Sequence, residues 1–245
     1  MHSSNVICIL INLDRSPERL LQMQQRLSRL NLPFQRCVAI DGGLVNFSEK
    51  EINADEYERC HGKYVTTTEV ACYISHYRAL EMFVASDKEF ALILEDDMEF
   101  SNDFPLVLND LTTNHDNWDM IKFNGTSNWA VPVTKKKLIK DYRLIFNFLH
   151  QAKAGAYLLN RYAAISYLDK MLPMTVPIDH EFLKFWKYGI KIFTVLPFPA
   201  WESGAESTIN YAMVGKNRKK WYKRWSCYSY RLQIAMQRIY HGYKL

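Results

Sequence analysis

The segment NVICILINLDRSPER, residues 5–19, combines two patterns that together predict the start of an α/β fold. Its first part is mostly apolar and rich in β-branched side chains, which is typical of a strand buried on both faces. Ser16 and Pro17 then supply an N-cap and a first-turn proline. Leucine and methionine recur at helical spacing from Leu20 to Leu30. We therefore predict a strand that leads directly into an amphipathic helix.

Further strands and helices alternate along the chain. A second strand at 34–40 completes a β-α-β unit, which requires a parallel sheet. Residues 44–65 are polar and predict a loop with a short helix. Beyond them we predict strands at 90–94, 118–123, 155–159 and 190–196, and helices at 66–86, 161–172 and 177–188. This order predicts one α/β domain, with a mixed, mainly parallel sheet flanked by helices.

The composition is that of an ordinary globular chain. Of its 245 residues, 48% are hydrophobic and 23% are charged, which excludes disordered, collagenous and disulfide-scaffold proteins. The five cysteines form no C-x-x-C pair, so we expect free thiols in a reducing compartment. The apolar run near the N-terminus is interrupted by Asn12 and closed by Asp14, so we expect neither a signal peptide nor a membrane span.

The basic residues concentrate at the C-terminal end. Residues 215–245 hold nine Lys and Arg and no acidic residue, whereas residues 1–214 hold the other 22 basic residues and all 26 acidic ones. Apolar residues recur at helical spacing in this basic segment: Trp221, Trp225, Tyr228, Leu232, Ala235, Ile239 and Tyr243. We predict a globular domain over 1–210 and, over 211–245, a basic, aromatic, amphipathic helical tail.

Three interpretations of this tail remain open. Aromatic residues and cations together favour an anionic membrane surface. Alternatively, the apolar stripe packs on the domain and the basic face binds nucleic acid, or the tail is a solvated structural helix. We favour the membrane surface and expect no nucleic acid.

The acidic triplet Glu95-Asp96-Asp97 is the strongest local signal of chemistry. It directly follows the apolar run 91–94, so it lies at the carboxyl end of a strand, where ligands bind in open α/β sheets. In an extended chain Glu95 and Asp97 point the same way and Asp96 points elsewhere. Two converging carboxylates suit a hard cation such as Mg²⁺ or Mn²⁺. The alternative is a solvated acidic turn that caps the next segment.

Two arginines lie in the first strand-to-helix turn. Arg15 and Arg19 flank a helix N-terminus, and this combination suits a diphosphate. They could instead pair with Asp14 and Glu18. Asp41, after the second strand, suits a ribose hydroxyl, although aspartate before two glycines is also a good turn former.

Three other residues have both a functional and a structural interpretation. Ser75 and His76 lie in the middle of the helix predicted at 66–86, where a histidine is more often structural than catalytic. Asp179 is either a helix N-cap or a catalytic carboxylate. The chain contains no glycine-rich phosphate loop, no zinc-type spacing of cysteine and histidine, and no G-x-S-x-G turn.

Several of these segments together resemble glycosyltransferase family 25, the lipooligosaccharide and lipopolysaccharide galactosyltransferases of Gram-negative bacteria. The resemblance rests on ILINLDRSPER (9–19), VAIDG (38–42), EVACYISH (69–76) and ALILEDD (91–97), in that order. It continues more weakly through GAYL (155–158) and Pro177-Ile178-Asp179 and covers about residues 5–210.

The resemblance implies a GT-A-like fold, a nucleotide-sugar donor and inversion at the anomeric carbon. By this similarity Glu95 and Asp97 hold a divalent metal, Mn²⁺ or Mg²⁺, with Asp97 the safer ligand because the motif begins with glutamate here. The residues implied to bind the donor are Asn12, Arg15, Arg19, Asp41, Ser75, His76 and Asp96. An inverting transfer also needs a base, for which we expect Asp179, with Glu181 and Glu202 as rivals.

The expected reaction is transfer of a hexose, galactose from UDP-galactose, to a lipid-linked lipooligosaccharide or lipopolysaccharide core. The expected location is the cytoplasmic face of the bacterial inner membrane, with the enzyme attached peripherally through its tail. The alternatives are a glucosyltransferase that uses UDP-glucose, a metal-dependent phosphohydrolase, and a non-catalytic membrane-binding module.

Overall fold

The computed structural model describes residues 5–115, 117–126, 132–148, 152–204 and 225–244. Its strands are β1 (Val6–Asn12), β2 (Gln35–Val38), β3 (Phe90–Glu95), β4 (Met98–Phe100), β5 (Met120–Lys122), β6 (Pro132–Lys137), β7 (Arg143–Asn147), β8 (Ala156–Asn160), β9 (Ile192–Leu196) and β10 (Ala200–Glu202). Its helices are α1 (Pro17–Arg29), α2 (Ala54–His61), α3 (Thr67–Ala85), α4 (Phe104–Thr113), α5 (Arg161–Lys170), α6 (Ile178–Glu181), α7 (Phe185–Tyr188) and α9 (Trp225–Gly242).

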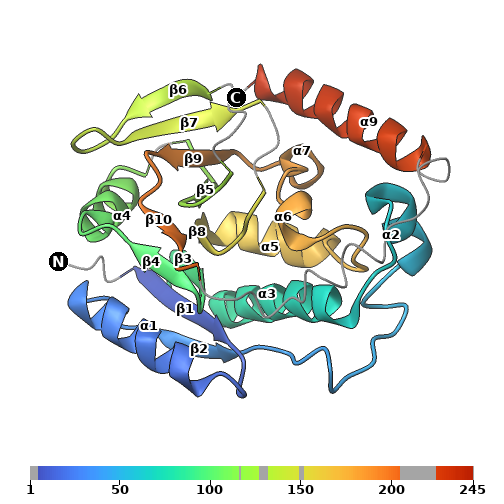
Figure 1. The fold of residues 1–245 in the computed structure, drawn as a ribbon. Helices are drawn as coiled ribbons and strands as arrows, with labels where there is room; N and C mark the ends of the chain where they lie inside the picture. The colour runs from blue at the N-terminus through green and yellow to red at the C-terminus, as the bar shows by residue number, and fades with distance from the viewer. Residues whose placement is uncertain (1–4, 116, 127–131, 149–151, 205–224, 245) are drawn as a thin grey trace.

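The main sheet has the strand order β2-β1-β3-β8-β5-β9-β7-β6 (Figure 1). Among these described strands, six run in one direction, and only β8 and β7 run in the other. The predicted mixed, mainly parallel sheet is therefore confirmed. The carboxyl ends of β1, β3 and β5 meet at one edge of the sheet, and the antiparallel strand β8 begins there. This edge collects most of the functional candidates.

The first β-α-β unit forms as predicted. Residues 9–12 of β1 pair in parallel with residues 35–38 of β2, and residues 6–11 pair in parallel with residues 90–95 of β3. The two crossovers move in opposite directions along the sheet, and right-handed connections then place α1 and α3 on opposite faces. All but one residue of β1 are buried, as its apolar sequence requires.

Helix α3 begins with the capping box predicted from the sequence. The Thr66 hydroxyl oxygen accepts from the Glu69 amide, and the Glu69 carboxylate accepts from the Thr66 amide. The helix is buried over more of its surface than a single stripe, because it packs against β1, β2 and β3 and also against α5. That wide burial places His76 inside the molecule, with 1% of its surface exposed.

The single helix predicted over 177–188 is wrong, because the chain forms two short helices there, α6 and α7. The carbonyl of Leu183, between them, accepts a hydrogen bond from the Arg238 guanidinium of α9 at 3.4 Å. In a continuous α-helix the Lys187 amide would donate to the Leu183 carbonyl, but here it donates to the carbonyl of Lys184. The sequence before α9 gives no sign of this distant donor.

Several elements were missing from the sequence prediction: β4, α4, the hairpin β6–β7, and β10. Strands β4 and β10 pair antiparallel as a separate two-stranded sheet next to the functional edge. They bring Glu202 opposite Met98, one residue beyond the acidic triplet. Strands as short as three residues are too brief to give a clear alternating pattern.

Helix α9 lies on the outside of the molecule and packs on α2 and α7 (Figure 1). Its buried residues are Cys227, Arg238 and Gly242. Arg238, one of the nine basic residues counted in the tail, is therefore buried and not part of an exposed basic face. Trp221 and the predicted boundary at residue 210 lie outside the described residues.

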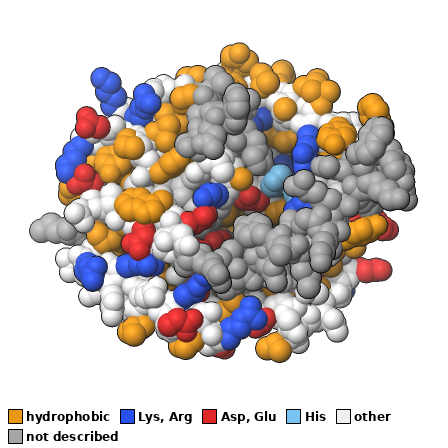
Figure 2. Space-filling view, in the orientation of Figure 1, with side chains coloured by type: hydrophobic (Ala, Val, Ile, Leu, Met, Phe, Trp, Pro, Cys, Tyr) orange, Lys and Arg blue, Asp and Glu red, His pale blue; other side chains and the backbone are white. Residues whose placement is uncertain are grey.

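The apolar stripe of α9 is largely exposed, although the Tyr243 ring contacts Phe148 and both Ala235 and Ile239 line a pocket against the domain. Trp225 and Tyr243 are 73% and 78% exposed, and hydrophobic side chains line the surface of this helix (Figure 2). The other described members of the predicted stripe are exposed as well: Tyr228, Leu232, Ala235 and Ile239. Among the described residues, no helix is long and apolar enough to cross a membrane.

Candidate functional site

Two adjoining pockets occupy the edge where β1, β3 and β5 end. The arginine pocket is lined by the β1–α1 turn, the segment after β2, α3 and the acidic triplet, and it includes Arg15 and Arg19. The Asp179 pocket is lined by the segment before β8, the start of α6 and Glu202. Cys72 and Glu95 line both pockets. The topology thus brings together residues from opposite ends of the chain.

Asp96 is tied to the β1–α1 turn. Its carboxylate accepts from the Asn12 side-chain amide at 2.7 Å and from the Arg19 guanidinium at 3.0 Å. Arg19 thus pairs with Asp96, which lies 77 residues further along the chain. Asp96 and Asp97 lie in the turn between β3 and β4, so the chain is not extended through the whole triplet. These contacts fix Asn12, Arg19 and Asp96 at the wall of the arginine pocket.

Arg15 stands at the rim of the arginine pocket and pairs with Asp41 rather than Asp14. Their side chains are 2.5 Å apart, and Asp41 also accepts from the Gly43 amide. The Arg15 side chain is 52% exposed, so it can change partner when an anion arrives. Asp41 binds Arg15 here and is not part of the pocket lining.

Ser75 and His76 both line the arginine pocket. The Ser75 hydroxyl donates to the Ala71 carbonyl at 2.7 Å and accepts from the Ile40 amide at 2.9 Å, which ties α3 to the segment after β2. The two ring nitrogens of His76 lie 3.0 Å from the Tyr157 hydroxyl and 3.1 Å from a Glu95 oxygen. The histidine therefore fixes the Glu95 carboxylate at the boundary of the two pockets.

Asp97 carries an unbalanced buried charge. No donor among the described residues reaches its buried Oδ1. Burial, followed by repulsion from Glu95 and Asp96, raises the pKa of Asp97 to about 7, although Arg19 opposes the shift. The unpartnered oxygen of Asp97 and the nearby carboxylate of Glu95 are hard oxygen donors, the kind of ligand that Mg²⁺ or Mn²⁺ prefers.

Asp179 faces the second pocket from the start of α6. Its Oδ2 accepts from the Lys153 backbone amide at 3.2 Å. The N-cap of α6 is Pro177, so Asp179 does not have the alternative role of N-cap. The carboxylate thus lies in the pocket wall, where it can receive a proton from a bound ligand.

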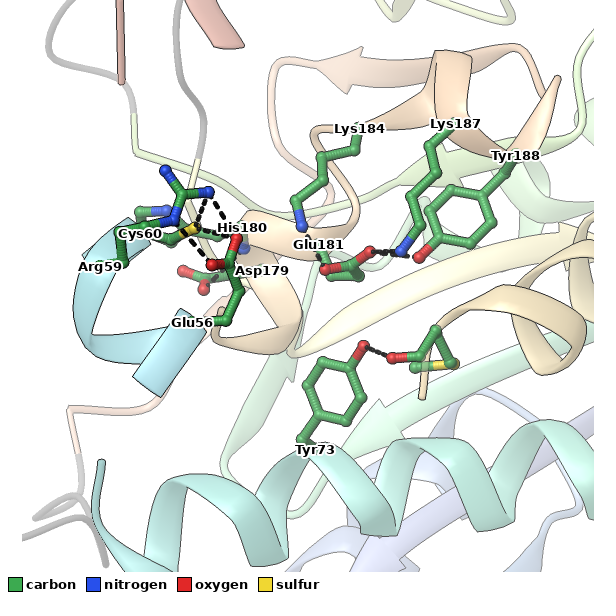
Figure 3. Close-up of polar contacts among 11 residues, drawn as sticks. Glu56, Arg59, Cys60, Tyr73, Asp179, His180, Glu181, Lys184, Lys187 and Tyr188 are labelled. Carbon is green, nitrogen blue, oxygen red and sulfur yellow. Dashed lines mark hydrogen bonds and ion pairs between the residues drawn. The ribbon is translucent and has the colours of Figure 1, made fainter. Parts of the chain in front are cut away.

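Glu181, one of the two rivals for the base, is occupied elsewhere. Its carboxylate binds Lys184 at 2.7 Å, Lys187 at 2.9 Å and the Tyr188 hydroxyl, in a buried network on the other side of α6 (Figure 3). Burial alone would raise the pKa of Glu181, but the two lysines outweigh it and hold this pKa below its usual range. Glu181 is therefore a structural residue.

Glu202, the other rival, remains inside the second pocket. Its carboxylate pairs with the Lys153 ammonium at 2.9 Å, and its charge contributes to the raised pKa of Asp97. Glu202 therefore lies on the side of the acidic triplet. Lys153 links the two sides, because its amide holds Asp179 and its ammonium holds Glu202.

Sequence reasoning missed three residues that shape this site. Lys153 has a φ of 84°, which is unusual for a residue other than glycine. A Cβ atom on Gly155 would lie 2.6 Å from the Met98 sulfur, so a larger residue here would have to displace the Met98 side chain beside the triplet. Cys72, one of the five cysteines expected to be free thiols, lines both pockets. For Gly155, the available signal was a glycine at the first position of the strand predicted at 155–159.

Comparison with known proteins places this arrangement in a family. Over 225 residues the chain is 25% identical to procollagen galactosyltransferase 1-A of Xenopus laevis, and over 213 residues it is 25% identical to a probable inactive glycosyltransferase 25 family member 3 of Rattus norvegicus. These alignments cover 82% and 78% of this chain but only 37% of each relative, so the chain spans little more than a third of their length.

A solved glycosyltransferase structure, involved in glycosylation of the major capsid of PBCV-1, aligns with a TM-score of 0.37 and 12% identity. The alignment covers 77% of this chain and 81% of that one. The decisive match is a sequence model described as glycosyltransferase family 25 (LPS biosynthesis protein), which covers residues 6–182. This match confirms the resemblance noted in the sequence: the chain belongs to glycosyltransferase family 25.

Proposed function

We propose that the protein is an inverting hexosyltransferase that moves galactose from UDP-galactose to a lipooligosaccharide or lipopolysaccharide core. Family membership supports glycosyl transfer, and the description of the matched family supports a saccharide acceptor of this class. One observation carries the proposal. Asp97, whose buried Oδ1 has no hydrogen-bond partner among the described residues, lines the pocket with two arginines, and this pocket adjoins the one that holds a candidate base.

The donor side is assigned to the arginine pocket. Arg15 and Arg19 would bind the diphosphate, since guanidinium groups match phosphate oxygens in a bidentate manner. Asn12 donates to Asp96, Asp96 in turn holds Arg19 in place, and Ser75 fixes the wall beside the nucleoside. A divalent cation bound by Asp97 and Glu95, Mn²⁺ or Mg²⁺, would neutralise charge on the departing diphosphate.

The acceptor side is assigned to the Asp179 pocket. The carboxylate of Asp179 takes the proton of the acceptor hydroxyl, whose oxygen attacks the anomeric carbon on the face opposite the diphosphate. The Lys153 amide orients this carboxylate through Oδ2. Attack from the opposite face inverts the anomeric carbon, so UDP-α-galactose yields a β-linked product.

A transfer assay tests the proposal. Purified protein is incubated with Mn²⁺, a truncated lipooligosaccharide and either UDP-galactose or UDP-glucose, and the product linkage is determined by NMR. We expect a β-linked galactose. Transfer of glucose alone would replace the donor assignment, and release of phosphate or sugar without an acceptor would favour a phosphohydrolase.

The proposed site of action is the cytoplasmic face of the bacterial inner membrane, where the tail would bind anionic lipid. Two observations on α9 support this. Most of its apolar and aromatic stripe is exposed, while Arg238 and Cys227 hold the other side of the helix against the domain. The segment that contains α9 is rich in cations and has no acidic residue. Aromatic rings and cations are the side chains that favour a lipid headgroup region.

A further inference from the structure

Three side chains with different ligand chemistry converge where the two pockets meet. Cys72 and His76 lie one turn apart on α3, and Glu95 ends β3 beside them. One ligand atom from each lies within 4.8 Å of the other two. No zinc-type spacing is visible in the sequence, because only two of the three residues are close in the chain. The fold brings in the third from β3.

The spacing of these atoms suits direct coordination. The Nε2 atom of His76 is 3.1 Å from a Glu95 oxygen, which is close to the separation of about 3.3 Å between two ligands on a tetrahedral ion with bonds of about 2.0–2.1 Å. Sulfur, imidazole nitrogen and carboxylate oxygen together are a ligand set for Zn²⁺ or Co²⁺ rather than for Mg²⁺. Three protein ligands leave a fourth position open.

An outer partner already orients the histidine. With Nε2 bound to a cation, the ring proton lies on Nδ1, which is 3.0 Å from the Tyr157 hydroxyl. Metal-bound histidines regularly donate their second N–H to such a partner. The Tyr157 ring stacks against His76 at a centroid distance of 5.7 Å, so the imidazole is held in this orientation.

We propose that Cys72, His76 and Glu95 form a binding site for Zn²⁺ or a similar thiophilic cation, and that occupation of this site inhibits transfer. The thiol of Cys72 releases its proton to solvent as the sulfur–metal bond forms. Bound in this way, Glu95 is withdrawn from Asp97, and an ion stands at the boundary of the two pockets. The inhibitory part rests on the proposed transfer function, whereas the binding part does not.

The binding test needs no enzyme activity. Co²⁺ is added to the purified chain, and the thiolate-to-cobalt charge-transfer absorption is followed, with Zn²⁺ used to displace it. We expect the absorption in the wild type and in Cys60→Ser, a matched cysteine variant outside both pockets. We expect its loss in Cys72→Ser and Cys72→Ala, with both folds verified by circular dichroism.

The outer partner provides a graded test. Tyr157→Phe should retain the absorption but weaken Co²⁺ binding by roughly 10- to 100-fold. No absorption in the wild type, or equal absorption in folded Cys72→Ala, would overturn the proposal.

Inhibition is then measured on transfer at constant Mn²⁺. Zn²⁺ should inhibit the wild type and Cys60→Ser alike, whereas the remaining activity of Cys72→Ser should resist it. Charge-transfer absorption without any transfer activity would contradict the proposed function but leave the metal site standing. Transfer that is insensitive to bound Zn²⁺ would contradict the inhibitory role.

Discussion

The network around Glu181 and the site around Asp97 both keep carboxylates away from water, yet they balance the charge in opposite ways. Glu181 binds two lysines and a tyrosine hydroxyl, and its pKa is held below its usual range. Asp97 has a buried oxygen without a partner, and its pKa is raised to about 7. The residue types are equivalent, so the surroundings decide the role. A buried carboxylate with hydrogen-bond and charge partners stabilises the fold, whereas one with an unpartnered oxygen is suited to bind a ligand.

Among these variants, Asp97→Asn should lower transfer the most. If the carboxylate acts on a ligand, transfer should fall by about 10³-fold, since metal-assisted charge stabilisation contributes several kcal/mol. Stability should not fall, because a buried and unmatched charge disappears. Transfer rates and thermal unfolding check the two halves. If Asp97→Asn is less stable but transfers normally, Asp97 is a structural residue and not a ligand-binding one.

Asp179→Asn tests the second pocket. A general base contributes roughly 10²- to 10⁴-fold to the rate, so kcat should fall within that range. UDP-galactose should bind as in the wild type, because Asp179 lies outside the arginine pocket. Steady-state kinetics and donor binding are the measurements. A selective rise in KM for the donor would show that Asp179 belongs to the donor side.

Glu181→Gln is the matched change in the network, two residues away on the same helix. Loss of this charge leaves the ammonium groups of Lys184 and Lys187 without their carboxylate, and should lower the free energy of unfolding by about 3 kcal/mol. Denaturant unfolding measures this, and transfer per folded molecule should persist.

The pH dependence of that loss has a defined sign. The folded pKa of Glu181 is depressed, so its contribution is present above the unfolded pKa of about 4.3 and is lost as the pH falls through the lower folded value. The gap between the wild type and Glu181→Gln should therefore close in acid. A constant gap would mean that shape rather than charge sets the effect.

The smallest expected effect concerns α9. Leu232→Ser removes one exposed apolar side chain from the stripe and should weaken binding to anionic liposomes by about tenfold, from roughly 1.5 kcal/mol of lost burial. Gln233→Ser, on the same exposed helix, is the control and should bind normally. Sedimentation with vesicles measures both. Equal binding of the two variants would contradict a lipid role for the stripe.

The first half of the fold could be predicted because its signals are local. The apolar strand, the proline at the helix start and the capping box at Thr66 each lie within a few residues, and β1, α1 and α3 formed as expected. The edge position of the acidic triplet followed from the same local pattern.

The rest depends on contacts between distant residues. Arg238 donates to the Leu183 carbonyl inside the segment predicted as one helix, 177–188, although it lies 55 residues further along the chain. Arg19 pairs with Asp96, 77 residues away along the chain, and Glu181 pairs with Lys187, which the turn after α6 brings within reach. No local pattern distinguishes Asp179 from Glu181. The side of the helix that faces the pocket makes that distinction.

We infer that Asp97 holds a cation for a nucleoside diphosphate at this edge of the sheet. Calorimetric titration of UDP, once in Mn²⁺ and once in a chelator, measures this directly. Wild-type protein should bind UDP much more tightly with Mn²⁺, and Asp97→Asn should show the same weak binding in both conditions. UDP binding that is equally tight in the chelator, or equally Mn²⁺-dependent in folded Asp97→Asn, would contradict the account.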